Sequence, residues 1–179
     1  MEIETISKDA KRSIIHLLSR LLQVEYDLLF NYPRVIDKLV KIDKVHDEQI
    51  INALEDMVKD SLRHFDSVDK LVKSLGGETV WRVDALDLSV GVEEVLRQQL
   101  EKETYAIAWY EEVKNVAERN KVKARGFLSR LVGSSDELPE DFVNVNDIIS
   151  LCERNILDEE RHQRLVRDSI DKLRVLMNK

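Results

Sequence analysis

The segment ILDEERHQRL, residues 156–165, places two polar side chains on a helical face that is otherwise apolar. Glu159 follows Ile156 by three positions and precedes Val166 by seven, and both are helical spacings. His162 follows Glu159 by three, so the two side chains share one face. A carboxylate buried alone is costly, and we therefore expect it to be protonated, paired or bound to a metal ion.

Three other stretches of the chain show the same interruption of an apolar stripe. Glu25, His64 and Glu103 each occupy a position at which helical spacing demands an apolar residue. Their neighbours on the stripes are Leu21, Leu28, Met57, Val68, Leu100 and Ala106. Each of four predicted helices thus carries an ionisable residue near the middle of its inward face.

The composition favours a few long helices in one domain. We predict that residues 1–179 form a single domain. The 179 residues include only 5 Gly and 2 Pro, so we expect few turns. We predict helices over about 8–40, 47–75, 89–119 and 144–177, with a kink or restart at Pro33 and a stop at Gly76-Gly77. Ser89 is the expected N-cap of the third helix. Residues 78–89 are long enough to cross the bundle, and 120–143 form an insertion with a short helix and a loop.

Carboxylates and imidazoles that converge inside a four-helix bundle are the ligands that two adjacent iron or manganese ions require. The order along the chain supports this interpretation. A helix with Glu25 precedes a helix with His64, and a helix with Glu103 precedes a helix with Glu159 and His162. The chain therefore looks like two copies of one hairpin, the second lengthened by the insertion.

These pieces resemble the ferritin-like superfamily, especially its rubrerythrin and Dps-like branches. The matching segments are VEYDLL (24–29), LRHFDSVDKLVKSLGG (62–77), LEKETYAIAWYEEV (100–113) and ILDEERHQRL (156–165). The resemblance implies an all-α, ferritin-like four-helix bundle with a long crossover between the second and third helices and an insertion between the third and fourth. It also implies that the metal ligands are Glu25, His64, Glu103, Glu159 and His162.

The chain departs from the family pattern at Ser61, where the resemblance implies a second bridging Glu three residues before His64. Asp60 could turn inward as a substitute, or the site could be asymmetric with one metal held more weakly. The sequence has one cysteine, Cys152, and so lacks the CxxC pair of a rubredoxin-type iron centre.

The leading functional hypothesis is an oxidoreductase with two iron ions, or alternatively manganese, that acts on peroxide or dioxygen as a ferroxidase or peroxidase. His64 and Glu25 would hold one metal, His162 and Glu103 the other, and Glu159 would bridge them. The expected partners are peroxide or dioxygen, ferrous iron, an electron donor that the sequence does not identify, and further copies of the chain in a homo-oligomer. An iron-storage or Dps-like cage and a metal-free helical interaction protein are the alternatives.

Charge and hydropathy exclude other classes of function. The net charge is −7 and no stretch reads as a basic groove, so no nucleic-acid partner is expected. No apolar run approaches the roughly 18 residues of a membrane span. The polar N-terminal segment lacks the basic start and apolar core of a signal peptide, which predicts a cytoplasmic protein.

Overall fold

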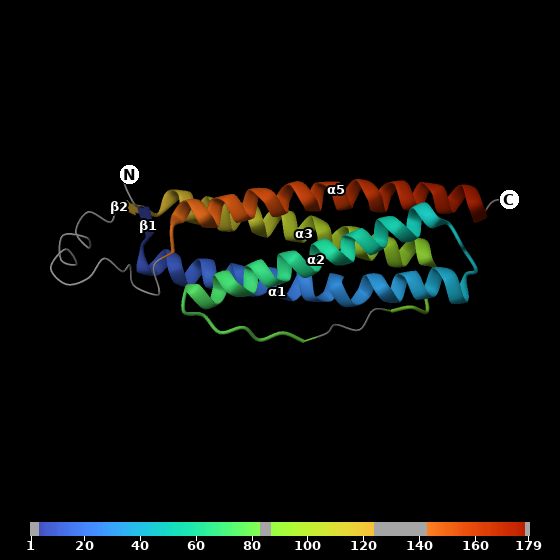
Figure 1. Ribbon diagram of the computed structural model, residues 1–179, viewed down its shortest axis with the longest axis horizontal. Helices are drawn as coiled ribbons and strands as arrows, with labels where there is room; N and C mark the ends of the chain where they lie inside the picture. Colours follow the sequence, from blue (N-terminus) through green and yellow to red (C-terminus); the bar gives the residue numbers. More distant parts are fainter. Residues whose placement is uncertain (1–3, 83–86, 124–142, 178–179) are drawn as a thin grey trace.

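The computed structural model describes residues 4–82, 87–123 and 143–177, and most of these residues lie in four long α-helices (Figure 1). The helices are α1 (Lys8–Asp37), α2 (Glu48–Ser74), α3 (Val92–Arg119) and α5 (Val145–Met177). A π-helical turn, η1 (Lys38–Ile42), continues α1, and two short strands, β1 (Glu4–Ile6) and β2 (Lys121–Lys123), complete the described elements.

The helices form the predicted bundle with its long crossover. α1 and α2 are antiparallel neighbours, and α2 ends at the opposite end of the bundle from the start of α3 (Figure 1). The connection between them therefore crosses the length of the bundle. α3 and α5 are again antiparallel, so the chain consists of two hairpins placed side by side. The prediction of an all-α four-helix bundle is confirmed.

Helix boundaries follow local capping chemistry. The Ser7 hydroxyl accepts a hydrogen bond from the Ala10 amide, and the Asp47 carboxylate accepts from the amides of Gln49 and Ile50. The prediction for Ser89 is wrong, because α3 begins after Gly91 and the Ser89 amide and hydroxyl both donate to Asp87.

Pro33 does not end the first helix. It lies inside α1 on the exposed side, where water can satisfy the carbonyl that its missing N–H leaves free.

The sequence patterns missed one small element, an antiparallel ribbon at the end of the bundle where α1 begins. β1 pairs with β2 in the register Glu4↔Lys123, Thr5↔Val122 and Ile6↔Lys121. The ribbon joins the N-terminal segment to the start of the predicted insertion. Residues 124–142, for which we expected a short helix and a loop, lie outside the described residues.

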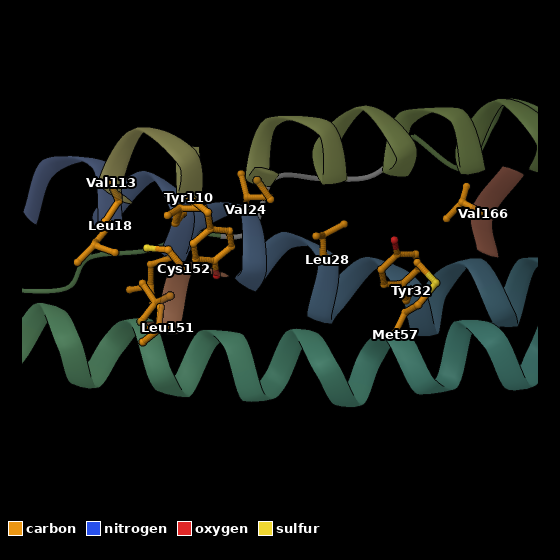
Figure 2. Packing of buried hydrophobic residues seen from close by; sticks show 14 of the residues in the cluster. Leu18, Val24, Leu28, Tyr32, Met57, Tyr110, Val113, Leu151, Cys152 and Val166 are labelled. Atoms are coloured by element: carbon orange, nitrogen blue, oxygen red, sulfur yellow. The ribbon is translucent and has the colours of Figure 1, made fainter. Parts of the chain in front are cut away.

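Apolar residues pack on both sides of a central polar layer, although Asn31 and Gln99 are also fully buried. Figure 2 shows Tyr110 and Tyr32 separated along the bundle, with Leu28 of α1 between them. Cys152 lies beside Tyr110 and Met57 beside Tyr32, and the buried residues Leu18, Val113 and Val166 lie farther out (Figure 2). The side chains of the polar layer therefore lie within the packed core of the bundle.

Candidate metal centre

The central layer contains one or two buried polar residues from each long helix. α1 contributes Glu25, α3 contributes Glu103, and α5 contributes Glu159 and His162. α2 contributes His64 and, one turn earlier on the same face, Ser61. All of these side chains have 0% of their surface exposed. The apolar stripe of each helix turns toward the bundle axis, and this rotation carries the polar members of the stripes inward.

The predicted ligands gather into two groups that share Glu159. One group is Glu25, His64 and Glu159, and the other is Glu103, Glu159 and His162. Within each group, one potential ligand atom per residue lies within 4.8 Å of the others. Both groups have the nitrogen and oxygen donors that suit iron and manganese.

Glu159 divides its two oxygens between the halves of the layer. Its Oε1 lies 2.8 Å from Nδ1 of His64, and its Oε2 lies 3.3 Å from Nδ1 of His162. Nδ1 of His64 is also 3.4 Å from Glu25, and Nδ1 of His162 is 3.5 Å from Glu103. A carboxylate that faces both halves in this way has the geometry of a bridging ligand.

Two aspartates contact the Nε2 atoms of the two histidines, the ring nitrogens that face away from the two ligand groups. Nε2 of His64 lies 3.3 Å from the carboxylate of Asp158 on α5, and Nε2 of His162 lies 3.2 Å from the carboxylate of Asp60 on α2. An outer carboxylate fixes the proton on Nε2, which leaves Nδ1 of a neutral imidazole free to bind a metal. Each histidine is thus oriented by the helix that carries the other.

Asp60 is therefore not among the inner groups, contrary to the suggestion that it turns inward in place of the missing carboxylate. It precedes His64 by four residues, and its carboxylate reaches across to α5, where Arg161 and His162 bind it. Arg63 lies 2.9 Å from Asp60 and 2.6 Å from Asp158, so the outer aspartates are neutralised by arginines.

Two buried tyrosines form hydrogen bonds with Glu25 and Glu103, the two glutamates that each belong to a single group. The Tyr110 hydroxyl donates to Oε1 of Glu25 at 2.7 Å and accepts from the Asn155 amide at 2.9 Å. The Tyr32 hydroxyl donates to Oε1 of Glu103. Both hydroxyls cross between α1 and α3, so each tyrosine limits the rotation of a glutamate on the neighbouring helix.

Sequence reasoning missed Tyr32, Asn155, Asp158 and the two outer arginines, although the internal repeat contains a signal for most of them. Tyr32 follows Glu25 by seven residues, as Tyr110 follows Glu103. The pattern Asp-x-x-Arg-His occurs at 60–64 and again at 158–162. Aligning the first helices of the two hairpins on Glu25 and Glu103 would have identified the tyrosines, and aligning the second helices on His64 and His162 would have identified the aspartates and arginines.

The protonation state of the layer follows from burial and from the crowded carboxylates. Burial raises the pKa of Glu159, and the nearby charges of Glu103 and Glu25 raise it further. Burial alone would lower the pKa of His64, but Glu25 and Glu159 raise it to about 11. Burial likewise opposes protonation of His162, but Glu103 and Glu159 raise its pKa to about 10. In the metal-free protein at neutral pH, both imidazoles are therefore protonated.

The contacts among the site residues leave several potential metal-binding atoms without a hydrogen-bond partner. Four ligand atoms have no hydrogen-bond partner among the described residues: Glu25 Oε2, Glu103 Oε2, Glu159 Oε1 and His64 Nδ1. The last two lie 2.8 Å apart without forming a hydrogen bond. Buried polar groups normally have partners, so these atoms favour a bound cation. The assignment of the five ligands nevertheless stays a prediction.

Comparison with known proteins identifies the fold. The chain matches a crystal structure described as "ferritin like, diiron-carboxylate proteins from Bacillus anthracis str. Ames", with a TM-score of 0.66 and 18% sequence identity over 93% of this chain and 99% of that chain. This likeness shows that the chain has the ferritin-like fold. No family model and no curated protein sequence matches the chain. No helix among the described residues is long and apolar enough to cross a membrane.

Proposed function

We propose that this protein binds two iron ions, or alternatively two manganese ions, and is an oxidoreductase of the ferroxidase or peroxidase type that acts on peroxide or dioxygen. The observation that carries the proposal is the division of the Glu159 carboxylate between two buried carboxylate–histidine groups. The description of the structural neighbour as a diiron-carboxylate protein supports it.

In this proposal each residue has a defined role. Glu25 and His64 hold one metal, Glu103 and His162 hold the other, and Glu159 bridges them. A bound pair of redox-active metal ions would supply the electrons that reduce peroxide or dioxygen. Tyr110 keeps Glu25 in position through a hydrogen bond, and Tyr32 does the same for Glu103. The apolar layers on both sides exclude bulk water and strengthen electrostatic interactions within the site.

The partners that we propose follow from this chemistry. Ferrous iron or a separate electron donor would restore the reduced metal pair, and peroxide or dioxygen would accept the electrons. We further propose that the protein acts in the cytoplasm as a homo-oligomer, without a nucleic-acid or membrane partner.

The test is a metal count with an optical spectrum taken before and after peroxide is added. We expect two metal ions per chain, a spectral change with peroxide, and peroxide consumption or ferrous-iron oxidation. Glu159→Ala should lose more metal than Glu25→Ala, because Glu159 belongs to both groups. Glu160→Ala is the matched control, since Glu160 is the exposed neighbour on the same helix.

The outcomes distinguish the proposal from its alternatives. Purified protein that retains no iron or manganese would point to a metal-free helical interaction protein. Metal-loaded protein that forms a large shell with a mineral core, as seen by native mass measurement, would point to iron storage. Equal metal loss from Glu159→Ala and Glu25→Ala would contradict the bridging role.

A further inference from the structure

Ser61 breaks the internal repeat at the position that matters most for the metal centre. The segment Asp60–His64 of α2 matches the segment Asp158–His162 of α5 in its aspartate, arginine and histidine. The outer contacts are also reciprocal, because Asp60 binds His162 and Asp158 binds His64. Ser61 therefore occupies the place on α2 that Glu159 occupies on α5.

The Ser61 side chain is buried beside the metal centre without a partner. It has 0% of its surface exposed, and its hydroxyl forms no hydrogen bond with any described residue. It shares the inward face of α2 with His64, one turn away. A serine side chain is too short to contact both groups as Glu159 does. Within the described part of the chain, Glu159 therefore has no counterpart on α2 that could act as a second bridging carboxylate.

The charges of the buried layer favour an anion at that position. Glu25, Glu103 and Glu159 supply three negative charges against the four positive charges of two divalent ions, provided that both imidazoles are neutral. The outer aspartates do not correct the difference, since Arg63 and Arg161 neutralise them. An uncompensated positive charge would remain in a buried site, where such charges are costly.

We propose that the metal-loaded site binds one small planar carboxylate-type anion beside Ser61, such as formate, acetate or bicarbonate, which would serve as a second bridge between the two metal ions. The Ser61 hydroxyl donates a hydrogen bond to this anion, which gives the buried hydroxyl its missing partner. The inference rests on the proposed two-metal function and adds an external ligand to it.

The wild-type protein allows a direct test. Manganese(II) is titrated into metal-free protein by calorimetry in chloride buffer, alone and with formate, acetate, bicarbonate or phosphate. We expect two binding steps, of which the weaker is strengthened about tenfold by the planar anions, a size comparable to that of other supporting interactions at metal sites. Tetrahedral phosphate should have a smaller effect. The ¹³C resonance of labelled formate should broaden with manganese-loaded protein and not with zinc-loaded protein.

Three variants test the role of Ser61. Ser61→Glu should bind both ions tightly without formate and lose the formate effect, because it supplies the second bridge itself. Ser61→Ala removes the hydroxyl and adds no bulk, so the formate effect should weaken but persist. Ser13→Glu makes the same substitution at an exposed position of α1 and should retain the wild-type formate effect.

The outcomes separate this inference from the proposed function. Two bound ions with no anion effect and no broadening of formate would show that water completes the site, and would overturn the inference alone. Failure to bind metal under any condition would overturn the proposed function and the inference with it. If Ser61→Glu does not fold, the titration of the wild-type protein with and without formate still tests whether the anion binds.

Discussion

At the scale of single residues, the outer aspartates tie the two halves of the site together. Asp60 and Asp158 each lie on one of the two helices that carry histidines and contact the histidine of the other. Relative movement of α2 and α5 would therefore disturb both imidazoles at once. Arg63 bridges the two aspartates at the surface and holds this arrangement in place.

Removing either aspartate should weaken one metal-binding step. Asp60→Ala releases His162 and should weaken the step that involves Glu103, while Asp158→Ala releases His64 and should weaken the step that involves Glu25. Each loss should be about 10–100-fold in affinity, the range found for residues that support metal ligands. Calorimetric titration with manganese(II) measures both steps.

The matched control is Asp56→Ala, one turn before Asp60 on α2. Asp56 is exposed and pairs with Lys59, so its removal should leave both affinities unchanged. The same loss of affinity in all three variants would mean that charge, rather than orientation of the imidazoles, is responsible.

At the scale of the secondary-structure elements, the end of α2 depends on two glycines with different roles. Gly76 has a φ of 73°, and its amide donates to Lys73 while the Gly77 amide donates to Val72. These bonds form a Schellman motif, which ends the helix. Gly77 is required for close packing instead, because a Cβ there would lie 2.8 Å from side-chain atoms of both Ile15 and Val72.

Gly77→Ala should destabilise the protein by about 1–3 kcal/mol, as overpacking of a core does. Urea unfolding followed by circular dichroism measures the free energy of unfolding. Gly91→Ser is the control, since a Cβ there meets nothing within 4 Å, its φ of −61° suits an L-residue, and serine is a favourable N-cap for α3. That variant should stay within about 0.5 kcal/mol of the wild type. Equal stability of both variants would show that Ile15 and Val72 move aside.

At the scale of the whole molecule, the metal-free bundle contains a central layer of charge that its apolar core does not compensate. The carboxylates of Glu25, Glu103 and Glu159 repel one another unless protons or cations separate them. The raised pKa values of Glu159 and of both histidines show that protons serve this purpose in the metal-free protein. Protons and metal ions therefore compete for the same atoms.

Metal binding should accordingly release protons and become tighter as pH rises. Calorimetry at neutral pH in buffers of different ionisation enthalpy should show proton release from His64 and His162. Binding heats that do not depend on the buffer would contradict these protonation states.

The stability of the metal-free protein should follow the same groups. A raised imidazole pKa contributes stability that is complete below the usual value of 6.5 and is lost as pH rises through about 10 for His162 and about 11 for His64. The melting temperature of the metal-free protein should therefore fall from neutral pH toward pH 10, and that of the metal-loaded protein should fall less. Parallel curves for the two forms would contradict this linkage.

Local patterns in the sequence determined the helices, the glycine stop after α2 and the inward positions of Glu25, His64, Glu103, Glu159 and His162. Helical periodicity is a property of neighbouring residues, so a polar residue within an apolar stripe is visible without any tertiary contact. The carboxylate expected at Ser61, by contrast, was implied by the resemblance to the ferritin-like superfamily and not by periodicity.

Only the tertiary structure decided which partner each of these residues meets. Asp60 and Ser61 are adjacent in sequence, yet one contacts His162 across the bundle and the other is buried without a hydrogen bond. Tyr32 reaches Glu103, which lies 71 positions away. Such contacts depend on the rotation and axial offset of packed helices, which side-chain packing over the whole core sets and which the period of a single helix does not contain.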